Sequence, residues 1–115
     1  MNNIKNDSYY LLKALKEISI IEDYTKNINS YSEFISDGLL LDGVMFRLVQ
    51  LIEHIKNISK EFKNAHSNIP WGNIIGFRNG IVHEYGETDY SIVYDIVFRD
   101  IYILKELQYS IRCCL

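Results

Sequence analysis

The sequence predicts an all-α fold, an antiparallel bundle of four to five helices, and three observations support this prediction. Apolar residues recur at spacings of three and four over long stretches, which is the period of an amphipathic helix. Only one proline and six glycines interrupt these stretches. No stretch alternates apolar and polar residues as a half-buried strand does. We therefore expect helices packed on helices.

The chain has 115 residues, which suits one domain, and we expect residues 1–115 to form a single helical domain. Its 48% hydrophobic and 13% aromatic residues are enough for a real core. The net charge of −3 argues against a broad, sequence-independent coating of nucleic acid. It leaves room for a small basic cleft, because a ligand responds to the charge at its own site.

No apolar signal-peptide core follows Met1, and no uncharged apolar run approaches the roughly 20 residues that cross a bilayer. We therefore expect a cytoplasmic protein with no membrane contact. The only cysteines, Cys113 and Cys114, are adjacent, so they cannot staple the fold, and a reducing compartment fits them. No His, Cys and carboxylate cluster has metal-ligand spacing, and no glycine-rich phosphate loop occurs, so we expect no metal and no cofactor.

The first predicted helix runs from about Asp7, its expected N-cap, to Lys26. Its expected apolar stripe consists of Leu11, Leu12, Leu15, Ile18 and Ile21. A short amphipathic helix is predicted at 30–36. There Ser30 and Glu33 have the spacing of a capping box.

The clearest predicted helix runs from about 39 to 63. Its apolar positions, spaced by four and three, are Val44, Leu48, Leu51, Ile55, Ile58 and Phe62. A polar loop at 64–68 follows. Pro70 suits the first turn of the next helix, which is expected to reach Val82 or just beyond.

The last predicted helix runs from Asp89, its expected cap, to about Arg112. Its apolar side is expected to contain Val93, Ile96, Val97, Leu104, Leu107 and Ile111. Tyrosines such as Tyr90, Tyr94 and Tyr102 suit core edges and interfaces, because a phenol is apolar at one end and polar at the other.

The side chains best suited to binding and catalysis are concentrated at 78–85. Arg78 is followed after four residues by His83 and after one more by Tyr85, and the polar Asn79 stands beside the arginine. Arginine keeps its charge and presents a planar donor fork that suits phosphate. Histidine titrates near neutral pH and can move a proton in either direction. Together these groups are a minimal set for RNA cleavage without a metal.

The same cluster also has a purely structural interpretation. An arginine and a histidine near the end of a helix are commonly solvated or capping groups that interact with the helix dipole. We expect His54 at a partly exposed surface or interface position and His66 solvated in its polar loop. Three further carboxylates are expected to be solvated charges on helix faces: Asp95, Asp100 and Glu106.

The chain resembles the HEPN superfamily, and within it the HepT-like toxins that pair with a minimal nucleotidyltransferase antitoxin. The resemblance rests on Arg78, His83 and Tyr85, on the approach at 69–79 and on the exit at 89–96. It extends from about 37 to 107. Glu53 stands where these proteins often have an acidic residue on the long central helix.

This resemblance implies a metal-independent endoribonuclease toxin that cleaves RNA by attack of the ribose 2′-hydroxyl. It implies His83 as acid and base, Arg78 as phosphate clamp, and Asn79 and Glu53 in supporting positions. It also implies a type VII-like toxin–antitoxin pair, in which the partner nucleotidyltransferase silences the toxin by transferring AMP to Tyr85.

Helical geometry bears on how the motif is assembled. Arg78 and Tyr85 fall about 20° apart around an ideal helix, whereas Arg78 and His83 fall about 140° apart. One straight helix therefore does not direct Arg78 and His83 at one spot. Either the helix ends or unwinds near His83, or two copies of the motif face each other across a symmetric cleft, as in the family's homodimers. We expect a homodimer with the motif helix at or near the two-fold axis.

Two other functions stay open. The protein could be a non-catalytic helical binding partner, an adaptor or nucleotide-binding subunit of a nucleotidyltransferase. The net charge of −3 and Glu84, which adds a negative charge inside the motif, favour this alternative. The protein could also be a structural dimer without an active site. The intact pair of Arg78 and His83 favours the enzyme.

Overall fold

The structure is a computed structural model that describes residues 3–83 and 89–108, with side chains described at 6–77 and 89–108. All regular secondary structure within these ranges is helical, which confirms the predicted all-α class. The elements are α1 (Asn3–Thr25), α2 (Tyr31–Ser36), α3 (Gly38–Lys56), α4 (Lys60–Ala65), α5 (Trp71–His83), α6 (Tyr90–Asp95), the π-helical η2 (Ile96–Asp100) and α7 (Ile101–Lys105). None of the described helices combines the length and apolar character that crossing a bilayer requires.

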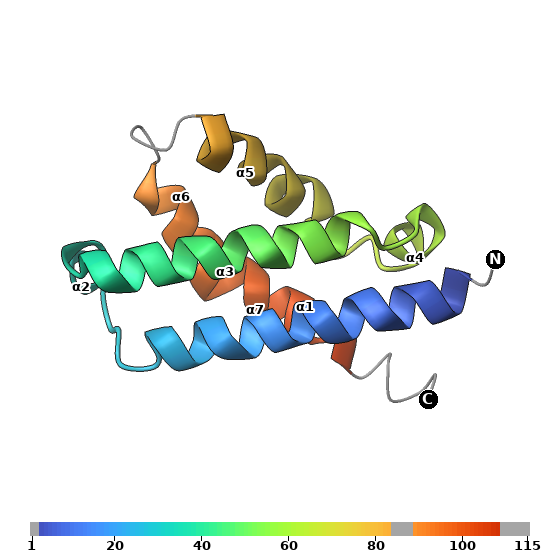
Figure 1. Ribbon diagram of the computed structural model, residues 1–115, viewed down its shortest axis with the longest axis horizontal. Helices are drawn as coiled ribbons and strands as arrows, with labels where there is room; N and C mark the ends of the chain where they lie inside the picture. Colours follow the sequence, from blue (N-terminus) through green and yellow to red (C-terminus); the bar gives the residue numbers. More distant parts are fainter. Residues whose placement is uncertain (1–2, 84–88, 109–115) are drawn as a thin grey trace.

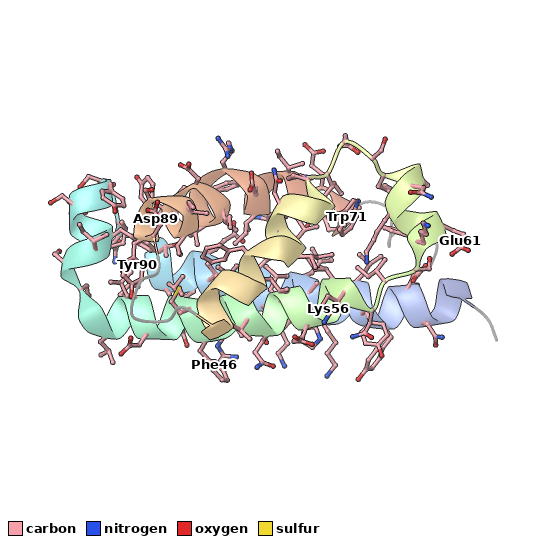
Figure 2. The ribbon with its side chains drawn as sticks, turned by 90° about the horizontal axis from the view of Figure 1, so that it is seen from above. Phe46, Lys56, Glu61, Trp71, Asp89 and Tyr90 are labelled. Atoms are coloured by element: carbon pink, nitrogen blue, oxygen red, sulfur yellow. The ribbon has the colours of Figure 1, made fainter. Side chains whose placement is uncertain are left out.

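The helices are arranged around α3. Helices α1 and α3 pack side by side along most of their length, and α5 lies against α3 on the side away from α1 (Figure 1). Helices α6, η2 and α7 follow one another as a single rod that crosses the α1–α3 pair on one side (Figures 1 and 2). The short helices α2 and α4 stand at opposite ends of α3 (Figure 1).

The core forms around one buried stripe of α3. Five of its residues are completely buried: Val44, Leu48, Leu51, Ile52 and Ile55. The rod contributes Val93, Ile96, Val97, Ile101, Leu104 and Leu107 to the same core, whereas Ile111 lies outside the described residues. Each fully buried leucine or isoleucine stabilises the fold by about 1.5–3 kcal/mol. The predicted stripes of these two helices are therefore confirmed where the structure describes them.

Helix α1 differs from its prediction at two residues. Leu12, expected in the core, is 50% exposed, and Ala14 is buried instead. The reason is that Leu11 and Leu12 lie about 100° apart around the helix, so an arc centred on Leu11, Ala14 and Ile18 excludes Leu12. Asp7 is not the N-cap, because α1 begins at Asn3 and the Asp7 side chain is buried.

The predicted helix over 39–63 is divided in two by a turn at 57–59. Ser59 caps α4, because its hydroxyl accepts a hydrogen bond from the backbone N–H of Phe62 at 3.1 Å. The Asp7 carboxylate accepts hydrogen bonds from the backbone N–H and the hydroxyl of Ser59, each at 2.7 Å. This contact takes the N–H that a continuous helix would direct at its own carbonyls. The apolar period persists because Ile58 stays buried within the turn.

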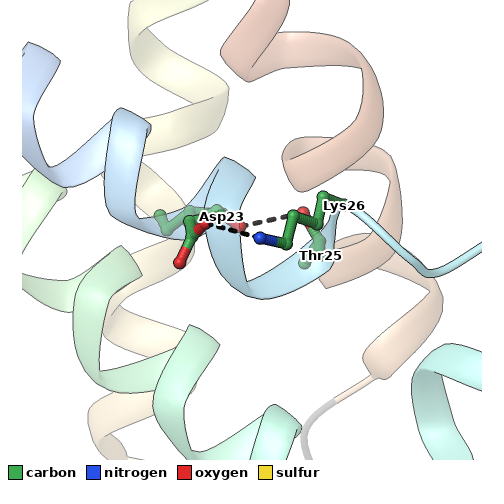
Figure 3. A network of polar contacts seen from close by, with 4 residues as sticks. Asp23, Thr25 and Lys26 are labelled. Atoms are coloured by element: carbon green, nitrogen blue, oxygen red, sulfur yellow. Dashed lines mark hydrogen bonds and ion pairs between the residues drawn. The ribbon is translucent and has the colours of Figure 1, made fainter.

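Local caps define the ends of the shorter elements. The Ser30 hydroxyl accepts from the Glu33 N–H at 3.2 Å, which confirms half of the capping box. The Glu33 carboxylate accepts from the N–H of Asn29 at 2.9 Å, one residue before the expected donor. At the end of α1, the buried Thr25 hydroxyl donates to the Ile21 carbonyl at 2.8 Å (Figure 3).

The rod of α6, η2 and α7 differs from a uniform α-helix at its centre. The π-helical turn of η2 widens the helix by one residue per turn and shifts the face that the following residues present. Asp100, the last residue of η2, is buried and accepts a hydrogen bond from Arg99 Nε at 3.2 Å. The expectation of a solvated charge is therefore wrong for Asp100, whereas Asp95 and Glu106 are exposed as expected.

The contact between Asp7 and Ser59 should couple α1 to the α3–α4 turn. Asp7→Ala and Ser59→Ala should each lower the free energy of unfolding by about 1–3 kcal/mol. Asp7→Ala removes the acceptor of both Ser59 bonds, and Ser59→Ala removes the hydroxyl that bonds Asp7 and caps α4. The double variant should cost less than the sum of the two, since the shared contact is lost only once. Urea unfolding of the four proteins measures this.

Ser36→Ala is the matched control. It removes an exposed hydroxyl that bonds only the local Glu33 carbonyl, so a change within about 0.5 kcal/mol is expected. Strictly additive losses for Asp7→Ala and Ser59→Ala would contradict the coupling.

Candidate functional site

The motif is placed on the last two turns of α5. The helical backbone includes Arg78, Asn79 and His83, and α5 ends at His83, in agreement with the predicted helix. The side chains of these three residues lie outside the described part of the chain, as do Glu84 and Tyr85 altogether. The structure therefore positions the motif through its backbone and through the residues that hold α5.

Helix α5 is anchored at its N-terminal end. Trp71, its first residue, is buried and donates a hydrogen bond from Nε1 to the His66 carbonyl at 3.1 Å. Ile69 and Ile74 are buried on either side of it. The Pro70 carbonyl accepts from the N–H of Ile74 at 3.2 Å, so proline stands directly before the helix and starts its hydrogen-bond ladder. These contacts fix the start of the helix that carries the motif.

His66 has a structural position that the sequence did not predict. It is half-buried, its ring stacks on Phe62 at a centroid distance of 4.2 Å, and its Nδ1 lies 3.0 Å from the Phe62 carbonyl. Because a carbonyl can only accept, Nδ1 must supply the proton of this hydrogen bond. The expectation of a solvated loop histidine is wrong, since the apolar face of Phe62 covers the ring. His66 links the end of α4 to Trp71.

The register of α5 separates the two charged motif positions. Arg78 follows Trp71 by seven residues and Ile74 by four, so its backbone position continues the buried line of the helix. Helix α5 packs against α3, and Arg78 falls on the same side of α5 as Trp71 and Ile74 by register. His83 lies about 140° around the helix, at its end. The angular divergence that the sequence predicts is thus retained in the observed helix.

Glu53 is half-buried on α3. The flank of α3 that meets α1 is marked by Arg47, whose guanidinium pairs with Glu17 at 3.5 Å. Glu53 lies about 120° from Arg47 around the helix, beyond the exposed Phe46. Glu53 therefore lies off the α1-facing flank of α3, and α5 packs on the side of α3 away from α1 (Figure 1). His54 is half-buried, as expected.

Helix α6, the first described helix after the motif, has Asp89 as its N-cap. The Asp89 carboxylate accepts hydrogen bonds from the Ser91 N–H at 3.0 Å and from the Ser91 hydroxyl. These bonds hold the pKa of Asp89 below its ordinary value, because they favour the ionised carboxylate. The predicted cap at Asp89 is confirmed. Residues 84–88 therefore connect the end of α5 to a fixed start of α6.

A surface hollow of about 380 Å³ lies away from the motif, where the end of α1 meets the start of α3. It is lined by Tyr24, Asp37, Leu39, Leu40 and Gly43. None of these is an arginine or a histidine, so the hollow lacks the groups that phosphate chemistry needs. Among residues 3–83 and 89–108, no cluster of His, Cys, Asp and Glu could hold a metal ion.

An all-α bundle whose helix α5 ends in an arginine–histidine motif defines a HEPN-like helical protein. Residues 14–111 match the HepT-like family, described as Ribonuclease HepT-like, and the chain belongs to this family. The resemblance drawn from the motif and its flanks is thereby confirmed at the level of a ribonuclease family.

Curated relatives agree with this assignment. The chain is 32% identical over 109 residues to "Putative RNase TTE0752" of Caldanaerobacter subterraneus subsp. tengcongensis. This match covers 95% of the chain and 94% of the relative. It is 31% identical over 96 residues to "Probable ribonuclease HepT" of Thermococcus cleftensis, and this match covers 84% of the chain and 86% of the relative. No solved structure matches the chain significantly.

Proposed function

We propose that this protein is a metal-independent endoribonuclease toxin. The observation that carries the proposal is the Arg78-x4-His83 motif at the end of α5 in a member of the HepT-like ribonuclease family. RNA is its substrate. Its control partner is a minimal nucleotidyltransferase antitoxin, and the pair acts in the cytoplasm.

In the proposed reaction His83 transfers protons and Arg78 binds phosphate. His83 takes the proton from the ribose 2′-hydroxyl, whose oxygen attacks the adjacent phosphorus. The bond to the leaving 5′-oxygen breaks, and that oxygen takes the proton back from the His83 imidazolium. The products are a 2′,3′-cyclic phosphate and a free 5′-hydroxyl. Arg78 binds the scissile phosphate and stabilises the charge that builds on its oxygens. Asn79 orients the phosphate or the imidazole.

Glu53 is proposed as a supporting residue. It is half-buried on α3, and α5, which carries Arg78, packs against α3. A carboxylate on α3 would orient a guanidinium on α5 and keep its donor fork directed at phosphate. The role is one of positioning, because Glu53 is not proposed to touch the reacting atoms.

A homodimer completes the proposed site. Arg78 and His83 occupy positions about 140° apart on α5, so two copies of α5 across a two-fold axis would bring the arginine of one protomer to the histidine of the other. The strongly exposed Leu39 and Phe46 on α3, at 86% and 57%, supply apolar surface of the kind that dimers cover.

Substitution of the motif residues tests the catalytic proposal. His83→Ala should lower RNA cleavage by about 10²–10⁴-fold, the usual contribution of a general acid or base. Arg78→Ala should also remove cleavage, and Arg78→Lys should restore it only in part, because lysine lacks the planar fork. Growth inhibition in cells and cleavage of a labelled RNA in EDTA are the two measurements.

His54→Ala is the control for histidine loss, since His54 is half-buried on α3 and outside the motif. It should keep both toxicity and cleavage. If wild type, His83→Ala and Arg78→Ala are equally harmless and equally inactive on RNA, the protein is instead the non-catalytic binding partner. The net charge of −3 and Glu84 favour that second candidate.

Mixing the two inactive variants tests whether the site is shared between protomers. In a mixed dimer of Arg78→Ala and His83→Ala, one of two shared sites would hold both native groups, so partial cleavage should return on co-expression. Light scattering should report a dimer at micromolar concentration. If a proven mixed dimer does not regain RNA cleavage, Arg78 and His83 of one site belong to the same chain. If light scattering reports a monomer, the proposal of a site shared between protomers is wrong.

Control of the toxin is proposed to act on Tyr85. Transfer of AMP from ATP to the Tyr85 hydroxyl forms a phosphodiester and releases pyrophosphate. The added negative charge and nucleotide would stand two residues from His83, where they would offset Arg78 and obstruct RNA. The nucleotidyltransferase partner would supply this reaction.

Tyr85→Phe should therefore separate activity from control. The variant should cleave RNA nearly as well as wild type, because the phenol oxygen is not a reacting group, but the partner should no longer neutralise it. Intact-mass analysis after co-expression should show AMP on wild type and none on Tyr85→Phe. An unmodified Tyr85 in a fully neutralised complex would mean that binding alone provides control.

A further inference from the structure

The outward face of α1 presents an aromatic ring, an apolar side chain and two lysines together. Tyr9, Leu12, Lys13 and Lys16 line a surface hollow of about 290 Å³, and we call these four residues the α1 strip. All four are exposed, Tyr9 by 55% and Leu12 by 50%. They fall within an arc of about 100° around the helix, on the side away from the core residues Leu11 and Ala14. The strip is therefore one continuous surface.

The tyrosine of the strip is held in a definite orientation. Its ring meets that of Tyr10 edge to face, with centroids 5.1 Å apart and planes at 84°. Tyr10 is half-buried and packs against the core, so it supports Tyr9 from the protein side. The Lys13 ammonium lies 5.5 Å from the centroid of the Tyr9 ring. The strip thus presents a supported aromatic ring with a cation beside it.

The strip is locally positive although the chain carries a net charge of −3. The nearby acidic residues of α1 are engaged elsewhere. Glu17 pairs with Arg47 at 3.5 Å, Asp23 pairs with Lys26 at 3.2 Å (Figure 3), and Asp7 accepts from Ser59. No ion pair joins Lys13 or Lys16 to a carboxylate among the described residues. Their charge is therefore available to an anionic ligand.

The strip borders the seam between α1 and α3. Lys13 precedes Glu17 by one turn, and Glu17 contacts α3 through Arg47, so Lys13 lies along the α3-facing edge of α1. Helix α5 packs on the other flank of α3 (Figure 1). Two interhelical distances of about 8–10 Å each separate α1 from α5. A strand that leaves the motif would cross α3 to reach the strip.

We propose that the α1 strip is a second contact site for single-stranded RNA, separate from the motif. Lys13 and Lys16 bind backbone phosphates, and a base stacks on Tyr9 with Leu12 against its edge. A supported ring beside an ammonium matches a nucleotide, which carries a planar base and an anionic phosphate. An acidic protein helix would need a longer apolar face than Leu12 supplies. The inference rests on RNA as the substrate proposed above.

Binding measurements on an uncleaved RNA test this inference. In a His83→Ala background, Lys13→Gln/Lys16→Gln should weaken binding of a labelled single-stranded RNA and reduce the salt slope of log K by about 1.4, roughly 0.7 per phosphate contact. Tyr9→Ala should weaken binding by at least about fivefold through lost stacking. Fluorescence anisotropy over a salt series measures both effects.

The chain offers a matched control for each variant. Lys56→Gln/Lys60→Gln removes the same charge from exposed lysines of α3 and α4, and Tyr102→Ala removes a tyrosine that is 54% exposed on α7. Neither should change RNA binding by more than about twofold. Equal weakening by both lysine pairs would show general charge attraction and overturn the proposal. Unchanged binding by both strip variants would overturn it as well.

Substrate length separates this inference from the catalytic proposal. With native His83, the strip variants should cleave an oligonucleotide of about four nucleotides at the wild-type rate, because it reaches only the motif. They should show a raised KM with an unchanged kcat on a longer RNA. If wild type cleaves both RNAs and the strip variants match it on both, the strip proposal fails while the function stands. If no RNA is cleaved but the strip variants still bind less RNA, the function fails and the strip stands.

Discussion

Burial of one apolar stripe of α3 is the constraint on which the rest of this structure depends. The stripe from Val44 to Ile55 is completely buried, and the core residues of α1 and of the α6–α7 rod pack around it. Because those elements converge on a single helix, they cannot shift independently. Helix α5 uses a flank of the same helix, so the motif is held relative to the core through α3. The position of the candidate site is thus a consequence of how α3 is buried.

The same packing anchors the helix that carries the motif at its first residues. Trp71 and Ile74 fix the first turns of α5 in the core. The last turns carry Arg78, in the register of Trp71 and Ile74, and end at His83. The divergence of the two positions follows from helical geometry and leads to the proposal that two protomers share the site.

Charge in this protein is organised locally. Asp7, Glu17 and Asp100 are buried and engaged with Ser59, Arg47 and Arg99, so these negative charges act inside the fold. The net charge of −3 therefore does not describe the surface that an RNA strand would meet. An acidic protein can bind a polyanion where its carboxylates are turned inward and its lysines outward. Helix α1 has this arrangement, with Asp7 and Glu17 toward the protein and Lys13 and Lys16 toward solvent.

The sequence by itself determined the all-α class, the stripes of α3 and of the last helix, the caps at Ser30 and Asp89, and the helix that carries Arg78 and His83. Periodicity and capping are local properties, which is why a single chain reveals them. Only the tertiary structure decided that the helix over 39–63 breaks at Ser59, that His66 stacks on Phe62, that Asp100 is buried and that Leu12 faces solvent. The physical reason is packing that a periodic pattern does not contain. Asp7 of α1 holds the break at Ser59, and the choice between the neighbouring Leu11 and Leu12 depends on which arc of α1 meets the core. The carboxylate of Asp7 ends a helix that local propensity would have continued, because its hydrogen bonds to Ser59 come from a residue far away in the sequence.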